Sequence, residues 1–384
     1  MNTTAKPSGS ETILLVDDNP MNLQVLYQTL NSMRAKLLIA NNGEAALTIA
    51  RNELPGLILL DIMMPDIDGF EVCRRLKSNL ETQDIPVIFL SALDNTRDKV
   101  LGFQVGAVDY ISKPFQPEEV KARVTTHLTL HRLKQEVQFQ KDQLEQELKV
   151  VSAAQRRLLP KTLPTIEGLS LAVHYETSRY AGGDYYDIVQ INETTWGFLV
   201  ADAEGHSTSA AVLMAMTCAL FRSFENAPLG PDQVLDHINR HLCKVADPSF
   251  VTALFAVYSS ADRKLRVSNA GHPAPMVYVS SEKRAVEFTF KGLYPMGVYP
   301  YEQVPIGEKT LMPGDRLLFY TDGITERFNH DNKPYGKERL LHRLEAAAGT
   351  SAQQTLAVLI EDVERFAGGR PADDDELLLI GVIG

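Results

Sequence analysis

Hydrophobic and polar positions follow a repeating order along the first third of the chain. Short apolar runs, ILLV, KLLIA, LILLD, PVIFLS and VDYI, alternate with helix-length amphipathic stretches between Glu11 and about His127. Such alternation is typical of βα units, because parallel strands need crossover connections. The pattern predicts an α/β domain over residues 11–127, a doubly wound, five-stranded parallel sheet with helices on both faces. Residues 1–10 contain Pro, Gly and Ser, and we expect a disordered tail there.

Residues 128–159 have the composition of one long helix. Neither Gly nor Pro occurs between Thr129 and Leu159. Apolar residues recur at the a and d positions of a heptad, namely Leu130, Leu133, Val137, Leu144, Val151, Ala154 and Leu158. Gln140 and Glu147 interrupt this row. The pattern favours a helical linker that forms a parallel coiled coil, and hence a homodimer, with a solvated single helix as the alternative.

The remainder of the chain, residues 160–384, changes to strand-like runs around a few helices. The runs are LSLAVHY, WGFLVAD, VTALFAVYS, KLRVSNAG, PMVYVS, DRLLFYTD and ELLLIGVIG. Helical stretches are expected at 209–224, 230–245 and near 351–366. Strands gathered in this way, with helices segregated among them, predict an α+β sandwich.

Composition narrows the function classes. The length of 384 residues fits more than one domain, and 49 acidic against 38 basic residues give a net charge of −11. That charge argues against binding to nucleic acid or to an anionic membrane surface. No apolar stretch approaches the ~20 residues that a membrane helix needs, and the polar start has no signal-peptide core. The three separated cysteines fit reduced thiols, so we expect a cytoplasmic protein.

Charged and hydroxyl side chains stand at the carboxyl ends of the predicted parallel strands. They are Asp17, Asp18, Asp61, Ser91 and Lys113. Strand ends of an open α/β sheet share one edge, so these residues are expected to form one pocket. Three neighbouring carboxylates repel one another unless a cation lies among them, and oxygen ligands favour Mg²⁺. Asp61 could then attack a phosphoryl donor, with Lys113 stabilising the charge of the transferred oxygens.

The motifs LLVDDN, LLDIMMPDIDGFE, FLSA and DYISKPF resemble the receiver domain of two-component response regulators. The resemblance implies that a cognate sensor histidine kinase phosphorylates Asp61. It also implies Mg²⁺ held by Asp17, Asp18, Asp61 and the Met63 carbonyl, phosphate pairing by Lys113, switch residues Ser91 and Tyr110, and a cis bond before Pro114. The alternative for the Asp17–Asp18 pair alone is that it ends a strand and caps the next helix.

In residues 160–384, aspartates stand beside glycines at strand ends. The motifs are GGDYYD at 182–187, ADAEGH at 201–206, YTDG at 320–323 and ADDDE at 372–376. Such a set of oxygen ligands without Cys or His spacing selects Mg²⁺ or Mn²⁺ over zinc. Two such ions can hold a bridging water and aim it at phosphorus, which gives hydrolysis without a phosphoenzyme.

Together with LLPKTLP, NAGHP, LYPMGV, MPGD and YGKERL, these motifs resemble the PPM-type metal-dependent serine/threonine phosphatases, in the branch of the stage II sporulation phosphatase and sigma regulators. The resemblance runs from about Ala153 onward. It implies that Asp202 bridges two Mn²⁺ or Mg²⁺ ions and that the Ala203 carbonyl binds one of them. It further implies that Asp322 and Asp373 complete the first metal's ligands and that Asp184 orders metal-bound water.

Some positions leave alternatives open. The run Asp373-Asp374-Asp375-Glu376 fits the last family motif in two registers, and Asp373 is chosen because LLLI then aligns with the closing strand. Arg179 could hold the substrate phosphate as a bidentate donor, or be a solvated surface arginine. His206 and His272 could act as general acids, although histidines in tight loops more often fix a turn.

The whole pattern predicts a response regulator whose phosphorylation controls a metal-dependent protein serine/threonine phosphatase. By resemblance, the substrate is a phosphorylated anti-sigma-factor antagonist of the STAS type, in a partner-switching pathway. The alternative is a non-enzymatic adaptor that binds a sigma-regulatory protein through a phosphatase-like domain. Loss of the metal-binding aspartates would mark such an adaptor, and here all four are present.

Overall fold

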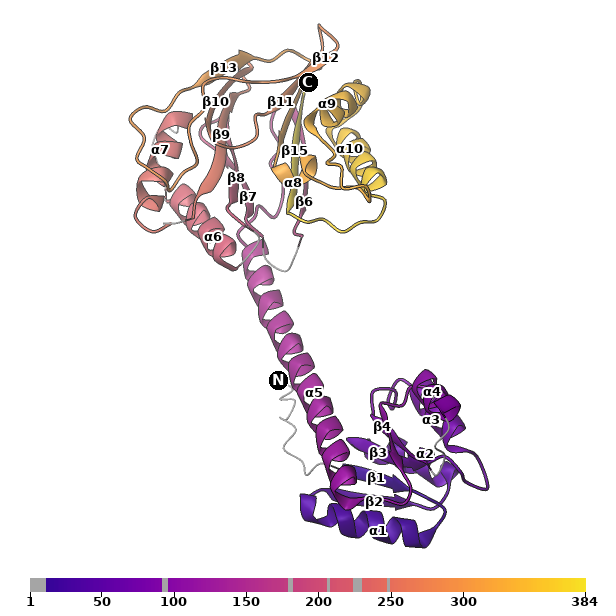
Figure 1. Ribbon diagram of the computed structural model, residues 1–384. Coiled ribbons are helices and arrows are strands. Elements are labelled where there is room, and N and C mark those ends of the chain that lie inside the picture. The colour runs from indigo at the N-terminus through magenta and orange to yellow at the C-terminus, as the bar shows by residue number, and fades with distance from the viewer. Residues whose placement is uncertain (1–11, 92–95, 179–181, 206–207, 224–229, 247–248) are drawn as a thin grey trace. The chain divides into compact units, whose positions relative to one another are not determined.

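The chain forms two compact units, residues 1–143 and 144–384. The computed structural model (Figure 1) describes residues 12–91, 96–178, 182–205, 208–223, 230–246 and 249–384. The expected disordered tail, residues 1–10, lies outside this part of the chain. Within the described residues, no helix has the length and apolarity needed to cross a membrane.

The first unit is built on one parallel sheet. Its strands are β1 (Thr12–Val16), β2 (Lys36–Ala40), β3 (Leu57–Asp61), β4 (Val87–Ser91) and β5 (Asp109–Ser112), in the order β2-β1-β3-β4-β5. Its helices are α1 (Pro20–Leu30), η1 (Asn31–Met33, a 3₁₀ turn), α2 (Gly43–Glu53), α3 (Gly69–Ser78), α4 (Thr96–Gln104) and α5 (Pro117–Arg156). The predicted doubly wound, five-stranded fold is confirmed.

Each face of this sheet has its own hydrophobic core. Alternate residues of β1 point to opposite faces, with Leu14 and Val16 in one core and Ile13 and Leu15 in the other. The first core is closed by α2 and α3, and the second by α1 and the first turns of α5. Burial on both faces explains why the strands are continuous apolar runs rather than alternating ones.

Helix α5 is longer than the predicted linker. It begins at Pro117, as the last helix of the sheet domain, and continues without a break to Arg156. The sequence between these residues holds no further Pro and no Gly, so nothing interrupts the helix before the approach to Pro160. The side chains of Leu130, Leu133, Val137 and Leu144 on α5 are exposed, each by more than half. The coiled coil stays a prediction.

The second unit contains two antiparallel sheets. One has the order β13-β10-β9-β8-β7 and the other β12-β11-β14-β15-β6. The strands are β6 (Leu169–Glu176), β7 (Asp184–Gln190), β8 (Thr195–Ala203), β9 (Val251–Ser259), β10 (Lys264–Ala270), β11 (Met276–Val279), β12 (Arg284–Glu287), β13 (Gly307–Thr310), β14 (Arg316–Tyr320) and β15 (Glu376–Ile383). The helices are α6 (Thr208–Arg222), α7 (Pro231–Leu242), α8 (Asp322–Thr325), α9 (Lys337–Ala346) and α10 (Ala352–Ala367).

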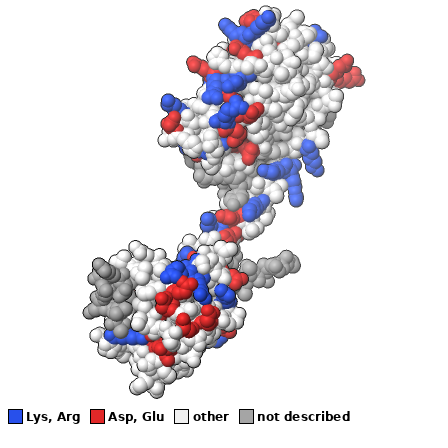
Figure 2. Space-filling model, turned by 90° about the vertical axis from the view of Figure 1, so that its right-hand side faces the viewer, with Lys and Arg blue, Asp and Glu red and all other residues white. Residues whose placement is uncertain are grey.

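The two sheets of this unit pack face to face, with helices on both outer sides (Figure 1). One core lies between the sheets, a second beneath α6 and α7, and a third beneath α9 and α10. The predicted sandwich is confirmed, as are the seven apolar strands. Strands β7, β12 and β13 and helices α8 and α9 were not predicted, because they are short or polar. On the face shown in Figure 2, basic side chains lie among acidic ones.

Candidate functional site

The carboxyl edge of the parallel sheet gathers the predicted receiver residues. Asp17 follows β1, Asp61 ends β3, and both carboxylates are buried. The Lys113 ammonium lies 2.8 Å from the Asp17 Oδ2 atom and 2.9 Å from the Asp61 Oδ1 atom. The Asn22 side-chain amide donates to both oxygens of Asp17 and fixes that carboxylate. The pocket therefore holds one ammonium against two buried carboxylates.

This pocket fits a divalent cation with oxygen ligands. Oxygen atoms of Asp17, Asp18 and Asp61 lie within 4.8 Å of one another, and Asp18 is exposed to solvent. Burial raises the pKa of Asp61, and the nearby charge of Asp17 adds to the effect, against hydrogen bonds from Lys113 and the Met63 backbone. A cation beside these groups offsets the repulsion between the carboxylates and keeps Asp61 ionised. The described residues contain no other group of three such ligands this close together.

The predicted switch residues lie on the two neighbouring strands β4 and β5. Ser91 is buried at the end of β4 and its neighbour on β5, Ser112, is followed by Lys113 and a cis bond to Pro114, as expected. The guanidinium of Arg123, on α5, lies 5.6 Å from the centre of the Tyr110 ring. Arg123 is itself held by two hydrogen bonds to Asp109. The sheet residue that is expected to switch thus contacts the helix that leaves this unit.

In the second unit, strand pairing places the predicted aspartates together. Asp184 begins β7 and stands directly opposite Asp202 near the end of β8. Asp322 begins α8, immediately after Thr321. The fully buried Thr321 hydroxyl donates to Asp184 Oδ2 at 2.6 Å and accepts from the Leu377 backbone at 3.1 Å. The sheet that contains β7 and β8 supplies Asp184 and Asp202. The remaining carboxylates follow β14 or precede β15 in the other antiparallel sheet.

The carboxylates of this group act strongly on one another. Burial, followed by the charges of Asp322 and Asp374, raises the pKa of Asp202 to about 8. Burial, followed by the charges of Asp374 and Glu326, raises the pKa of Asp322 to about 6. Asp184 is more deeply buried, and its pKa is raised well above the ordinary value. Buried carboxylates that act on one another in this way are unfavourable without cations near them.

Backbone close to this group leaves room for a ligand. A Cβ atom on Gly183 would collide with the Ala203 carbonyl oxygen and lie 3.1 Å from Asp202 Oδ1. Glycine at this position therefore leaves space beside both oxygens that the resemblance assigns to metal. Asp375, which was not predicted, accepts hydrogen bonds from the backbone of Ser178 and Gly183 at 2.9 and 2.7 Å. The oxygen-only donor set fits Mg²⁺ or Mn²⁺.

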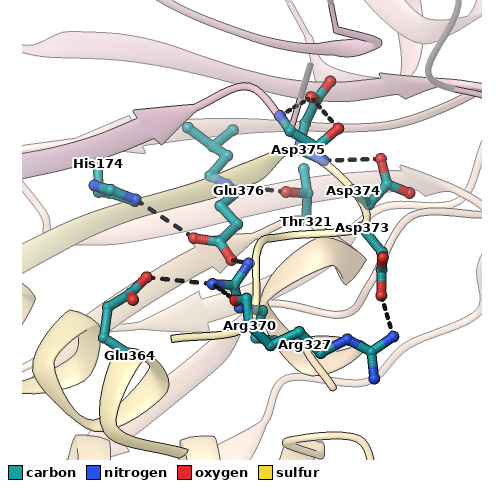
Figure 3. Close-up of polar contacts among 11 residues, drawn as sticks. His174, Thr321, Arg327, Glu364, Arg370, Asp373, Asp374, Asp375 and Glu376 are labelled. Atoms are coloured by element: carbon teal, nitrogen blue, oxygen red, sulfur yellow. Dashed lines mark hydrogen bonds and ion pairs between the residues drawn. The ribbon is translucent and has the colours of Figure 1, made fainter. Parts of the chain in front are cut away.

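Asp373 is the one described metal ligand candidate that the structure does not bring to this group. Its side chain is 61% exposed and pairs with Arg370 at 2.9 Å (Figure 3). Asp374 instead acts electrostatically on both Asp202 and Asp322. Strand β15 begins at Glu376, the first residue of the predicted run ELLLIGVIG. Of the two aspartates, Asp374 is thus the one that acts on the other carboxylates, and Asp373 is paired with Arg370.

The histidine and arginine candidates have different outcomes. His272 is buried, its Nδ1 lies 2.9 Å from the Thr252 hydroxyl, and its Nε2 lies 3.1 Å from the Tyr320 carbonyl. Burial lowers the pKa of His272 to about 3, so its ring is neutral and joins two strands behind the aspartates. Arg179 and His206 lie outside the described residues.

The end of helix α5 contacts the aspartate site through one side chain that sequence reasoning missed. Gln155 is buried, and its amide nitrogen donates to the Gly182 carbonyl. The Gly182 N–H donates back to Gln155 Oε1 at 3.2 Å. Gly182 precedes Gly183 and Asp184, and a Cβ on it would collide with the Asp375 carboxylate. A paired amide at the helix end thus holds the backbone next to the candidate metal ligands.

Comparison with known proteins agrees with the two domains. Residues 13–125 match the family model of the response regulator receiver domain, and residues 192–382 match that of stage II sporulation protein E. A "Probable transcriptional regulator ycf27" of Porphyra purpurea is 42% identical over 118 residues, which are 31% of this chain and 47% of that protein. The chain thus spans about half the length of the curated relatives it matches first.

Solved structures resemble the second unit in fold. The SiaA-PP2C domain of Pseudomonas aeruginosa superposes with a TM-score of 0.56 at 17% identity, over 64% of this chain and 98% of that one. The RsbU and RsbW domains of a Mycobacterium tuberculosis protein superpose with a TM-score of 0.51 at 22% identity. The superposition covers 59% of this chain and 63% of that one.

The parallel sheet, its buried aspartates and Lys113 define a response regulator receiver domain, in agreement with the match of residues 13–125. Its residues 192–382 belong to the stage II sporulation protein E family.

Proposed function

We propose that this chain is a response regulator in which phosphorylation of Asp61 controls a metal-dependent protein serine/threonine phosphatase. The phosphoryl donor is a sensor histidine kinase, and the substrate is a phosphorylated anti-sigma-factor antagonist of the STAS type. The fold of the second unit is similar to that of a protein with RsbU and RsbW domains, and this similarity in fold supports the proposed sigma-regulatory pathway. The chain acts as a homodimer through the exposed apolar row of α5.

The observation that carries this proposal is the group of mutually repelling carboxylates in the second unit. Asp184, Asp202 and Asp322 come from separate segments, and burial and the charges of neighbouring carboxylates raise the pKa of each, with Asp374 acting on both Asp202 and Asp322. A binding domain without catalysis has no use for such an unfavourable arrangement. The group therefore supports an enzyme over an adaptor that keeps only the shape of the fold.

Each part of the site has a distinct task in this proposal. Asp202, the Ala203 carbonyl, Asp322 and Asp374 would hold two Mn²⁺ or Mg²⁺ ions, and these ions would supply an activated water and neutralise the phosphate charge. Asp184 accepts a hydrogen bond from Thr321 and stands opposite Asp202 on the neighbouring strand, where it would order metal-bound water. The Arg179 side chain binds the substrate phosphate.

Phosphate release from a phosphoserine protein tests the proposal. The full chain should release inorganic phosphate from a phosphorylated STAS-type protein with Mn²⁺ or Mg²⁺ present, and chelation with EDTA should stop the release. p-Nitrophenyl phosphate serves as a second substrate that needs no protein recognition. An adaptor would bind the phosphorylated protein and release no phosphate from either substrate under any of these conditions.

The register of the acidic run gives a prediction with a built-in control. Asp374→Asn should lower Mn²⁺-dependent turnover by about 100-fold, because it removes one charged contact to the reacting centre. Asp373→Asn should stay within about twofold of wild type, since Asp373 is mostly exposed and paired with Arg370. Initial rates on p-nitrophenyl phosphate measure both variants. The opposite order of effects would restore Asp373 as the ligand.

The contact between Gln155 and Gly182 supports control through α5. Arg123 of this helix contacts the Tyr110 ring in the first unit, and Gln155 of the same helix holds the backbone beside Asp184 in the second. Phosphorylation adds charge that Ser91 and Lys113 can bind, and this draws Tyr110 toward the pocket. If this movement of Tyr110 shifts α5, the two hydrogen bonds between Gln155 and Gly182 would transmit the shift to Gly182.

Removing this amide should therefore weaken catalysis. We expect Gln155→Ala to lower turnover by about tenfold, because outer contacts that orient metal ligands have effects of this size. Gln138→Ala is the matched control, since Gln138 lies on the same helix and pairs only with Asp142 among its described contacts. Steady-state kinetics on both variants are the measurement. Equal turnover in Gln155→Ala and wild type would show that the contact between Gln155 and Gly182 does not contribute to catalysis.

A further inference from the structure

The segment that carries Asp374 has no regular secondary structure of its own. It leaves α10 at Ala367 and enters β15 at Glu376, and the intervening residues are turns and bends. A segment of this kind is fixed by its side-chain contacts rather than by a hydrogen-bond ladder. The position of Asp374 relative to Asp202 and Asp322 therefore depends on what holds the two ends of residues 370–376.

One arginine contacts both ends of this segment (Figure 3). Arg327 is 5% exposed, and its Nη2 donates to the Arg370 carbonyl at 2.7 Å. Its Nη1 lies 3.3 Å from Oε1 of Glu376, which is 4% exposed. A third contact, 3.5 Å from Nη2 to the exposed Glu364, joins the group to α10. The planar guanidinium thus spans the segment from its first residue to its last.

Burying the charges of Arg327 and Glu376 costs desolvation free energy. The Nε and Nη1 atoms of Arg327 and Oε1 of Glu376 make no hydrogen bonds among the described atoms. His174 lies on the other side of Glu376, with its Nε2 3.8 Å from Oε2. Replacing a buried ion pair by an apolar pair of similar volume is often neutral or stabilising. The ion pair therefore adds little to stability, and its consequence is geometric.

A second arginine separates Asp373 from Asp374. The Arg370 guanidinium donates to Asp373 Oδ2 at 2.9 Å and to Asn332 Oδ1 at 2.7 Å. The Asp373 side chain is thereby held toward solvent, near the turn that contains Asn332. Arg327 fixes the backbone at Arg370 through its carbonyl. Asp374, the next carboxylate after Asp373, accepts a hydrogen bond from the Asp375 N–H at 2.8 Å and acts electrostatically on Asp202 and Asp322.

We propose that Arg327 is a positioning residue for the metal centre, because it holds the Arg370 carbonyl and the Glu376 carboxylate and so places Asp374 beside Asp202 and Asp322. This inference rests on the proposed function. It assigns to Arg327 no contact with metal or substrate. Its effect is transmitted by the backbone of residues 370–376, and it acts first on metal affinity and through that on turnover.

The test is Mn²⁺ binding to the full chain, followed by electron paramagnetic resonance of the free ion. The receiver pocket binds Mn²⁺ in every variant and serves as the internal reference. Arg327→Met should weaken the phosphatase-domain sites by about tenfold or more, the size of effect seen for outer contacts to metal ligands. Arg327→Lys keeps the charge but loses the fork, and should weaken binding by a smaller factor. Arg339→Met, which breaks a partly exposed ion pair with Asp362 in the same unit, should leave Mn²⁺ binding within twofold.

A second variant separates positioning from the loss of a charge partner. Arg327→Met combined with Glu376→Leu leaves no unpaired buried charge, yet still lacks the bond to the Arg370 carbonyl. Its Mn²⁺ affinity should stay low. Full recovery in the double variant, unchanged affinity in Arg327→Met, or no Mn²⁺ site in the wild-type second unit would each overturn the proposal. Normal Mn²⁺ binding without phosphate release in wild type would instead contradict only the proposed function.

Discussion

Asp202→Asn should reduce Mn²⁺-dependent phosphate release to about 1% of wild type or less. Asp202 stands opposite Asp184 on the neighbouring strand and carries a pKa of about 8 from burial and from the charges of Asp322 and Asp374. An amide has the same shape but cannot neutralise two cations, so the site loses its central ligand while the fold is kept. Turnover on p-nitrophenyl phosphate at saturating Mn²⁺ measures the loss.

The receiver of the same variant provides the control. Labelling of Asp61 by acetyl phosphate should be unchanged in Asp202→Asn, which shows that the chain is folded and that the lesion is confined to the second site. Thermal unfolding close to that of wild type would support the same conclusion. Activity above about 5% of wild type in a folded Asp202→Asn protein would contradict the role given to Asp202.

Asp61→Asn should abolish covalent labelling by acetyl phosphate. The Asp61 carboxylate is the buried group that Lys113 contacts at 2.9 Å, and an amide oxygen in its place is a poor nucleophile. Phosphate incorporation, measured by intact-protein mass spectrometry with Mg²⁺ present, should fall to background. The hydrogen bond from Lys113 can still form in this variant, so the pocket should keep its structure.

Asp184→Asn is the matched variant in the other unit. It removes a buried carboxylate from the candidate phosphatase site and should leave acetyl phosphate labelling at the wild-type level. Label that persists on Asp61→Asn would place the phosphoryl acceptor at another residue. Label lost from both variants would point to general unfolding, which thermal denaturation would reveal.

The receiver pocket could be predicted from sequence because its geometry follows from topology alone. Parallel strands end at one edge of a sheet, so Asp17, Asp61, Ser91 and Lys113 had to meet once the strands were recognised. The Asp184 and Asp202 pair was also within reach, since both aspartates mark strand ends. Motif order was sufficient for these residues.

Long-range side-chain contacts were out of reach. The proposed choice of Asp374 over Asp373 rests on contacts of Arg370 and Arg327, and neither arginine is distinguishable in sequence from a solvated one. Gln155 is one polar residue in a helix rich in them, and its contact with Gly182 arises only when the chain folds. The sequence analysis placed a boundary between the first domain and the linker at residues 127 and 128, whereas α5 runs across it without a break.

Turnover of the full chain with and without beryllofluoride tests the central claim, that the receiver controls the phosphatase. Beryllofluoride mimics the phosphoryl group on Asp61, and the account predicts that it raises the rate of phosphate release from a phosphoserine protein by about fivefold or more, a typical size for coupling between two sites. Asp61→Asn, measured beside it, should show no response. Equal turnover with and without beryllofluoride, in a wild-type protein shown to bind it, would contradict the account.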